Sequence, residues 1–205
     1  MTIVLAGVIA VLKWNNINKK DKPIVIGWWI VILTETIKFI LSANGNKTLA
    51  PYNVYPLPLI GVFIWQFLSW GTISFRSAKW LFIILFFIWV ADMFVVNGPS
   101  INQFRNIFKL AMAVVIVILS VSTINQLIMS EKKKLITNHR FLICLGMTIY
   151  YTFSVFVNVF FLSKMSREFL TGIANFNRYL LQVYYFLLFL AAIWIPRKKN
   201  FILQF

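Results

Sequence analysis

The chain has 205 residues, of which 60% are hydrophobic and only 12% are charged, and its formal net charge is +15. Soluble domains are usually about 45–50% apolar and about 25% charged, because their surface faces water. The composition therefore excludes an ordinary soluble enzyme and predicts an all-α, polytopic transmembrane bundle that fills residues 1–205 as a single domain.

Long apolar runs mark the predicted helices, since a helix needs about 20 apolar residues to cross about 30 Å of hydrocarbon. The first run, Thr2–Leu12, is short, and it either spans the membrane or lies partly in the interface. Six longer runs follow it: Ile24–Leu41, Tyr52–Ile73, Trp80–Val96, Ile107–Ile128, Phe141–Leu162 and Ile173–Ile195. We expect about seven helices in all, with Pro56 and Pro58 setting the start or a kink of the third.

The basic residues fall mostly in the first, third and fifth connections and in the C-terminal tail. The side richer in Lys and Arg is expected to be cytoplasmic, which puts the N-terminus outside and the C-terminus inside a bacterial inner (cell) membrane. This bias explains the net charge of +15, so we do not expect the protein to bind nucleic acid directly. The run Lys132, Lys133 and Lys134 in the fifth connection is expected to contact anionic membrane lipid or to dock a cytoplasmic partner.

Three ionisable residues, Glu35, Lys38 and Asp92, lie inside predicted spans. An ionisable side chain at this depth costs about 2.5–3.5 kcal/mol on insertion scales, so each needs a partner or a function. Glu35 and Lys38 are three residues apart and can form an ion pair on one helix face. For Asp92 we keep two interpretations, a structural pair that locks two helices and part of a functional site.

Polar side chains also gather at one depth of the predicted bundle. In the predicted orientation the outer half holds Lys38, Tyr55, Asp92, Arg105, Asn158 and Arg178, with Glu35 near the middle, whereas the inner half is mainly aliphatic and aromatic. Such residues on several helices can build a small polar-ligand cavity that opens to the outside. Polar stripes at helical spacing are also typical of helix–helix hydrogen bonds, and this alternative stays open.

The sequence lacks the usual signatures of catalysis and of metal binding. His139 and Cys144 are the only histidine and the only cysteine, whereas a zinc site needs about four ligands. No phosphate-binding glycine loop or nucleophile motif is present. We therefore expect no cofactor, no metal and no catalytic residue, and we keep a lipid-acting intramembrane enzyme that uses Glu35 and Asp92 as a third alternative.

Several short motifs stand out along the chain: Thr34-Glu35 followed by Asn46, Tyr52-Asn53-Val54-Tyr55, Asn102-Gln103-Phe104-Arg105, and Phe141–Phe161 with Gly146 and Tyr150. In this order they resemble the sequences of uncharacterised small seven-helix membrane proteins of Bacteroidota. The resemblance implies the same topology and a site that includes Glu35, Asn53, Tyr55 and Arg105, and it brings no established activity. The stretch Pro58–Ile60 stands where those proteins often carry an acidic residue.

The richness in Lys, Asn, Ile and Phe suits an AT-rich genome. A second association, carried by no single motif, is with the small membrane accessory proteins of type VI-B CRISPR loci, and it implies a role in antiviral defence. Our first prediction is a non-enzymatic, regulatory or signalling inner-membrane protein that binds a small polar ligand or a cytoplasmic partner. The runner-up is a pore or transporter formed by a homo-oligomer.

Overall fold

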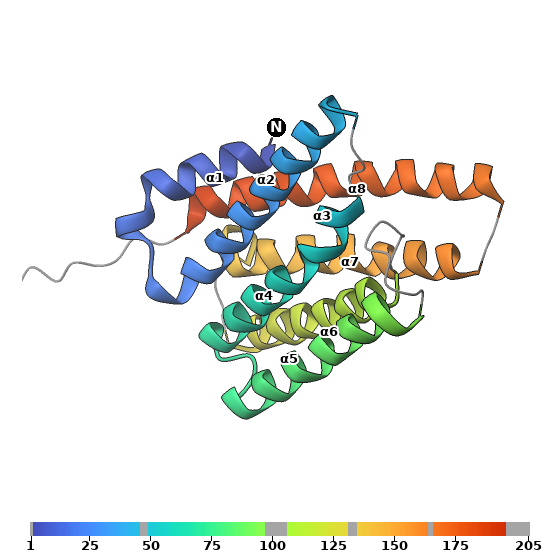
Figure 1. The fold of residues 1–205 in the computed structure, drawn as a ribbon. Helices are drawn as coiled ribbons and strands as arrows, with labels where there is room; N and C mark the ends of the chain where they lie inside the picture. The colour runs from blue at the N-terminus through green and yellow to red at the C-terminus, as the bar shows by residue number, and fades with distance from the viewer. Residues whose placement is uncertain (1, 46–48, 97–105, 131–134, 164–165, 196–205) are drawn as a thin grey trace, which may run out of the picture.

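The computed structural model describes residues 2–45, 49–96, 106–130, 135–163 and 166–195, and every regular element in these ranges is helical (Figure 1). The α-helices are α1 (Thr2–Leu12), α2 (Lys22–Ala43), α3 (Leu49–Val54), α4 (Pro56–Trp70), α5 (Phe75–Val90), α6 (Ile107–Ser130), α7 (His139–Leu162) and α8 (Arg167–Trp194). Short 3₁₀ turns lie at Trp14–Asn16, Lys19–Asp21 and Leu135–Thr137, and a π-helix, η3, covers Ala91–Val96. The prediction of an all-α fold is confirmed.

Five of these helices are long and apolar enough to cross a membrane, and they lie at Lys19–Ala43, Phe75–Phe94, Ile107–Ser130, His139–Leu162 and Glu168–Trp194. Only 22–44% of the most apolar part of each is buried inside the protein. Large apolar side chains such as Leu33, Phe87 and Ile118 are more than half exposed. A surface of this kind is stable against lipid rather than water, so the chain is a multi-pass membrane protein. Helix α1, with 11 residues, and α4, with 15, are shorter.

The predicted span Tyr52–Ile73 is divided into α3 and α4, and the break lies at Tyr55. Pro56 and Pro58 follow the break, and neither has an N–H group that could continue the helical hydrogen bonds across it. Proline in the first turn of a helix loses little, because N–H groups there have no helical partner. The prolines therefore set the start of α4, as expected from the sequence.

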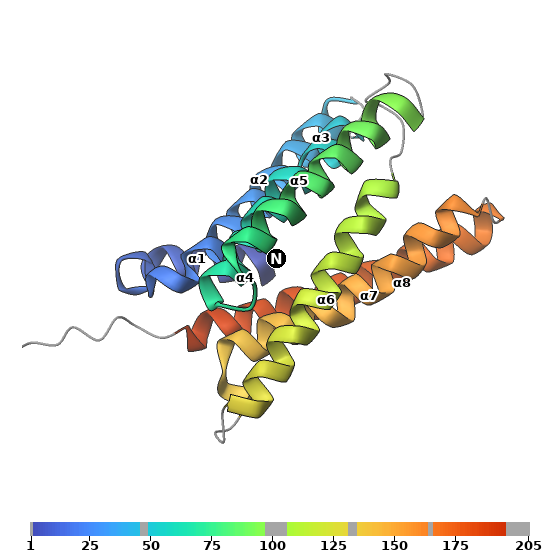
Figure 2. The same ribbon diagram turned by 90° about the horizontal axis from the view of Figure 1, so that it is seen from below.

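The helices form two groups, which Figure 2 shows from below. Helices α2, α3, α4 and α5 lie on one side, while α6, α7 and α8 lie on the other. Helix α1 contacts both α2 and α8 and so joins the groups, as α6 does through its contacts with α4 and α5. The core between them contains large buried side chains from both groups: Trp28, Ile60, Phe67, Ile116, Met147 and Leu188.

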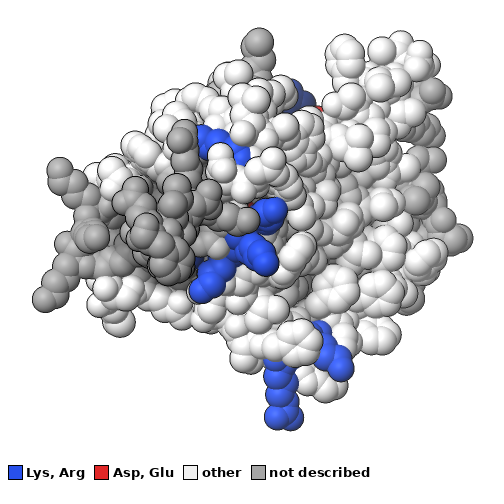
Figure 3. Space-filling model, turned by 90° about the vertical axis from the view of Figure 1, so that its left-hand side faces the viewer, with Lys and Arg blue, Asp and Glu red and all other residues white. Residues whose placement is uncertain are grey.

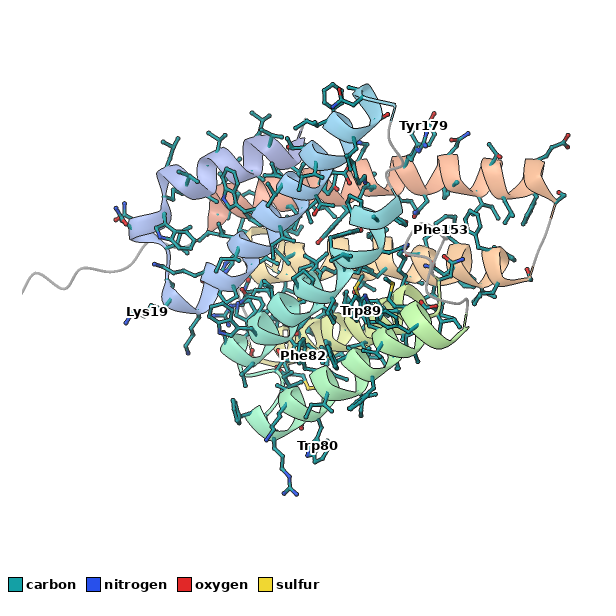
Figure 4. All side chains as sticks on the ribbon, in the orientation of Figure 1. Lys19, Trp80, Phe82, Trp89, Phe153 and Tyr179 are labelled. Atoms are coloured by element: carbon teal, nitrogen blue, oxygen red, sulfur yellow. The ribbon has the colours of Figure 1, made fainter. Side chains whose placement is uncertain are left out.

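Helices α7 and α8 pack closely along one line of contact. At Gly146 an added Cβ atom would lie 2.9 Å from the Cδ2 atom of Tyr184, so only glycine fits there without a shift of the ring. The rings of Tyr150 and Tyr184 stack with their centroids 5.5 Å apart. Further along, Phe153 of α7 meets Phe176 of α8 at 4.9 Å, and Figure 4 shows Phe153 between the two helices. Small residues commonly allow such close contact between membrane helices.

One end of the bundle is basic, and we call it the basic end; it is where α2, α5 and α7 begin. The turns and first helical turns there carry Lys13, Lys19, Lys20, Lys22, Arg76 and Lys79. Figure 3 views this end and shows Lys and Arg side chains gathered on it, and Figure 4 labels Lys19 there. Lys13 closes the C-terminal end of α8, because its Nζ atom donates to the carbonyl oxygens of Ala192 and Ile193 at 3.1 and 2.9 Å.

Candidate functional site

A cavity of about 420 Å³ lies among α1, α2, α3, α4, α6, α7 and α8, within the range of sizes typical of small-molecule sites. Its charged and polar lining is Glu35, Lys38, Tyr52, Tyr55, Lys109, Tyr150, Tyr151, Ser154, Asn158, Asn177, Arg178, Tyr184 and Tyr185. Six of the seven tyrosines of the chain are in this set. The seventh, Tyr179, is 72% exposed and points away from the bundle in Figure 4.

Helical periodicity explains how each wall reaches the cavity. On α2 the lining residues Trp28, Val31, Glu35 and Lys38 are separated by three or four positions, so they share one face. On α8 the same spacing places the lining residues from Ala174 to Leu188 on one face of the helix. This face is about 21 Å long at about 1.5 Å per residue. The cavity is therefore long in the direction of the helices.

The polarity of the lining changes along this direction. The end far from the basic end, which we call the charged mouth, contains the late residues of α2, the early residues of α8 and the start of α6: Glu35, Lys38, Lys109, Asn177 and Arg178. The deeper part is lined mainly by aromatic and aliphatic side chains, namely Ile3, Trp28, Leu59, Phe63, Tyr151, Tyr184 and Leu188. A molecule that fills the cavity therefore meets charge at one end and rings and alkyl groups at the other.

Two lysines meet at one aromatic ring in the charged mouth. The Nζ atom of Lys109, a buried residue, lies 3.6 Å from the ring centroid of Tyr52, and that of Lys38 lies 5.4 Å from the same centroid. Lys109 also donates to Oδ1 of Asn53 at 3.2 Å, and Lys38 donates to Oε1 of Glu35 at 2.6 Å. The carboxylate of Asp92 attracts Lys109, and the two ammonium groups repel each other. Cation–π contacts and the carboxylates of Glu35 and Asp92 offset part of that repulsion.

Other polar groups at the cavity have no partner among the residues that the structure describes. Trp28 is 2% exposed and its Nε1–H group has no hydrogen-bond acceptor within the described ranges. The buried Oδ1 atom of Asn177 likewise has no hydrogen-bond donor within the described ranges. A buried polar group without a partner costs about 1–3 kcal/mol, which a ligand or a bound water would recover. Both groups line the cavity, so they are positioned to contact what occupies it.

The structure places the predicted site residues as follows. Glu35, Lys38, Tyr55, Asn158 and Arg178 line the same cavity, and their role in ligand binding stays a prediction. Arg105 and the lysines Lys132, Lys133 and Lys134 lie outside the described residues, and their predicted roles stay predictions.

Asp92 is not among the residues that line the cavity. It lies in η3, the π-helical turn that ends α5, and this turn brings its carboxylate to the start of α6. There its Oδ2 atom accepts the backbone N–H of Phe108 at 2.9 Å. Asp92 is thus a cap for the N-terminal end of α6, which corresponds to the structural interpretation kept open at the sequence level.

Lys109 and most of the tyrosines were missed by reasoning from the sequence. Lys109 is the third residue of α6, so a count of loop charges assigns it to the connection before the helix. Its side chain is in fact 6% exposed and turned into the bundle. The tyrosines carried a usable signal, because Tyr150, Tyr151, Tyr184 and Tyr185 form two adjacent pairs on the helices α7 and α8.

A second polar group of residues, which we call the Asp21 cluster, lies buried at the basic end. Asp21 is 0% exposed, and its Oδ1 atom accepts Nε1–H of Trp70 at 2.8 Å and lies 3.1 Å from Nε2 of His139. Nε of Arg140 is 3.9 Å from the same oxygen. Gln66, 1% exposed, accepts the N–H of Ile24 and donates to the carbonyl of Lys20. These contacts join α2, α4 and α7.

The Asp21 cluster and the cavity differ in what they can bind. Among the described residues, no three of His, Cys, Asp and Glu come together as a metal site would require. The hydrogen bonds of the Asp21 cluster join the start of α2 to α4 and α7. Comparison with protein-family models, with curated proteins and with solved structures finds no match for this chain. The site therefore has to be interpreted from its own geometry.

Proposed function

We propose that this multi-pass membrane protein binds a small ligand in the cavity and does non-enzymatic, regulatory work at a bacterial inner membrane. The observation that carries the proposal is a cavity of about 420 Å³ that has a charged mouth and is lined by Trp28, whose buried N–H has no partner among the described residues. Membrane bundles bind ligands between helices in the same way. In the predicted orientation the charged mouth faces outside and the basic end faces the cytoplasm.

Binding is favoured over conduction by the deep part of the cavity. A pore needs a continuous polar path, because an ion in an apolar environment loses its hydration. Here the deep lining is rich in apolar residues such as Ile3, Leu59 and Leu188. Beyond it the basic end is held by buried, hydrogen-bonded groups around Asp21 and Gln66. A ligand that enters the mouth thus meets an apolar lining rather than a continuous polar path. The regulatory role follows from transmission of ligand binding to the basic end.

The test is native mass spectrometry of the protein extracted from its own membranes into detergent. The variant Ala174→Trp adds a large ring to the cavity wall on α8, whereas Ala43→Trp adds the same ring at the exposed end of α2, away from the cavity. We expect the natural chain and Ala43→Trp to carry a small molecule of constant mass and Ala174→Trp to have lost it. Equal occupancy in both variants, or no bound mass in any of the proteins, would reject the proposal.

A further inference from the structure

We infer that the ligand of this cavity is an anionic amphiphile with a phosphate head held in the charged mouth and an apolar body in the deep part. The inference rests on the proposed function and adds the chemical class of the ligand. Three cationic side chains, Lys38, Lys109 and Arg178, line the cavity together with the carboxylate of Glu35, and the carboxylate of Asp92 also attracts Lys109. The three cations outnumber these two carboxylates, so the mouth has an excess of positive charge that an anion would neutralise.

The positions of the cations strengthen this argument more than their number does. Lys38 and Lys109 both lie over the ring of Tyr52, where they repel each other. Like charges that face one ring in a membrane-embedded site are stabilised by each counter-charge that approaches them. Glu35 pairs with Lys38 through a side chain that is 52% exposed, and the carboxylate of Asp92 attracts Lys109. An anionic group beside the two ammonium groups would add an attractive contact with each of them.

Arg178 supplies the third contact. It comes from α8, across the cavity from α2, and no hydrogen bond or ion pair joins it to another residue within the described ranges. A guanidinium group donates two parallel hydrogen bonds to a phosphate or a carboxylate. Phosphate carries a charge of about −1.5 to −2 as a monoester and has three acceptor oxygens, so it matches two ammonium groups and one guanidinium better than a carboxylate does.

The deep part of the cavity determines the rest of the ligand. The distance from Lys38 down to Trp28 along α2 is about 15 Å at about 1.5 Å per residue. Over this length the cavity is lined by uncharged side chains such as Val31, Leu59 and Phe63. A free inorganic phosphate would leave this apolar volume empty. An alkyl or isoprenoid chain of moderate length would fill it, and burial of each methylene group contributes about 0.8 kcal/mol.

The experiment titrates the detergent-purified, full-length protein with four probes and counts bound molecules by native mass spectrometry. The probes are dodecyl phosphate, dodecanoate, dodecyltrimethylammonium and inorganic phosphate. We expect dodecyl phosphate to bind at least about tenfold more tightly than each of the others, since charge-assisted hydrogen bonds contribute about 1.5–3 kcal/mol. If inorganic phosphate binds as tightly as dodecyl phosphate, the inference that the ligand has an apolar body is wrong. If dodecanoate or dodecyltrimethylammonium binds as tightly, the inference that the ligand has a phosphate head is wrong.

Matched charge variants locate the binding. Arg178→Gln and Lys109→Gln each remove one cation from the mouth, whereas Lys79→Gln removes one from the exposed surface at the basic end. We expect the first two to weaken dodecyl phosphate about tenfold or more and the third to leave it unchanged. Arg178 is exposed, so its variant keeps the test valid if Lys109→Gln does not fold. Equal affinity in all three variants would overturn the inference.

The design separates failure of this inference from failure of the proposed function. Preferred binding of the cationic probe in the cavity, abolished by Ala174→Trp, would leave ligand binding intact and overturn only the anionic class. Failure of every probe, together with the absence of any co-purified molecule, would overturn both.

Discussion

The two ends of this bundle arrange buried polar groups differently. At the basic end Oδ1 of Asp21 brings an indole N–H and an imidazole into contacts of 2.8–3.1 Å, while Oδ2 of Asp21 and Nε of Arg140 have no hydrogen-bond partner among the described residues. Toward the other end polar side chains surround about 420 Å³, and two buried polar groups of this lining, on Trp28 and Asn177, have no described partner. The contrast teaches that polar groups gathered on one acceptor fix the position of helices, whereas polar groups around an open volume are available to a ligand.

The largest expected effect is the loss of the acceptor in the Asp21 cluster. Asp21→Ala leaves His139 and the N–H of Trp70 without their shared acceptor and Arg140 without its nearby counter-charge, so we expect the free energy of unfolding to fall by about 3 kcal/mol. Equilibrium unfolding in mixed detergent micelles measures this loss. Glu168→Ala, at an exposed acidic residue of α8, should stay within about 0.5 kcal/mol of the natural chain. A loss below 1 kcal/mol for Asp21→Ala would contradict the structural role.

The next largest effect is expected where the close contact between α7 and α8 lies beside the cavity. Gly146→Ala places a methyl group 2.9 Å from Cδ2 of Tyr184, and Tyr184 lines the cavity. We expect a loss of about 1–3 kcal/mol in stability and weaker dodecyl phosphate binding, because the ring must move. Gly172→Ala is the matched control, since nothing lies within 4 Å of its added Cβ atom. If both variants behave alike, the close contact between α7 and α8 does not shape the cavity.

A substitution of Asp92 tests whether this membrane carboxylate has a structural role or belongs to the ligand site. Asp92→Ala removes the acceptor for the N–H of Phe108, so we expect a loss of about 1 kcal/mol in unfolding free energy. The affinity for dodecyl phosphate should change less than about twofold, which is below about 0.4 kcal/mol. A tenfold loss of affinity at unchanged stability would instead return Asp92 to the ligand site.

The smallest effect on stability is expected at the charged mouth. Glu35→Gln removes an exposed i, i+3 ion pair with Lys38, which contributes about 0.2–0.5 kcal/mol. The same change removes the only carboxylate among the described residues that line the cavity, so dodecyl phosphate should bind more tightly. Titration followed by native mass spectrometry compares Glu35→Gln with the natural chain. Weaker binding in the variant would mean that Glu35 itself contacts the ligand.

The course of the helices was largely predictable from hydropathy. The runs Ile107–Ile128 and Phe141–Leu162 match α6 and α7 to within two residues at each end, because long apolar segments leave few alternatives. Pro56 and Pro58 predicted the start or a kink of a helix near Tyr55, whereas the division of the span into α3 and α4 depends on how the two helices pack. Helix α8 begins at Arg167, before the expected start at Ile173, because its first turns are polar but still helical.

The polar residues of the bundle were predictable only in part, because some of their contacts join residues that lie far apart in the sequence. Depth along each helix brought Glu35, Lys38 and Arg178 to one level without any knowledge of the neighbours. The pairing of Asp21 with His139 joins residues 118 positions apart, and no local pattern encodes it. The inward turn of Lys109 depends in the same way on the packing of α6 against other helices.

The most direct test of the central claim is a phosphorus count on the protein after exhaustive exchange into phosphate-free detergent. The account predicts about one retained phosphorus per chain for the natural protein and for Lys79→Gln, as expected for a single occupied site. It predicts close to none for the double variant Lys109→Gln, Arg178→Gln. Equal retention by that double variant, or no retained phosphorus in the natural protein alongside another bound molecule, would contradict the account.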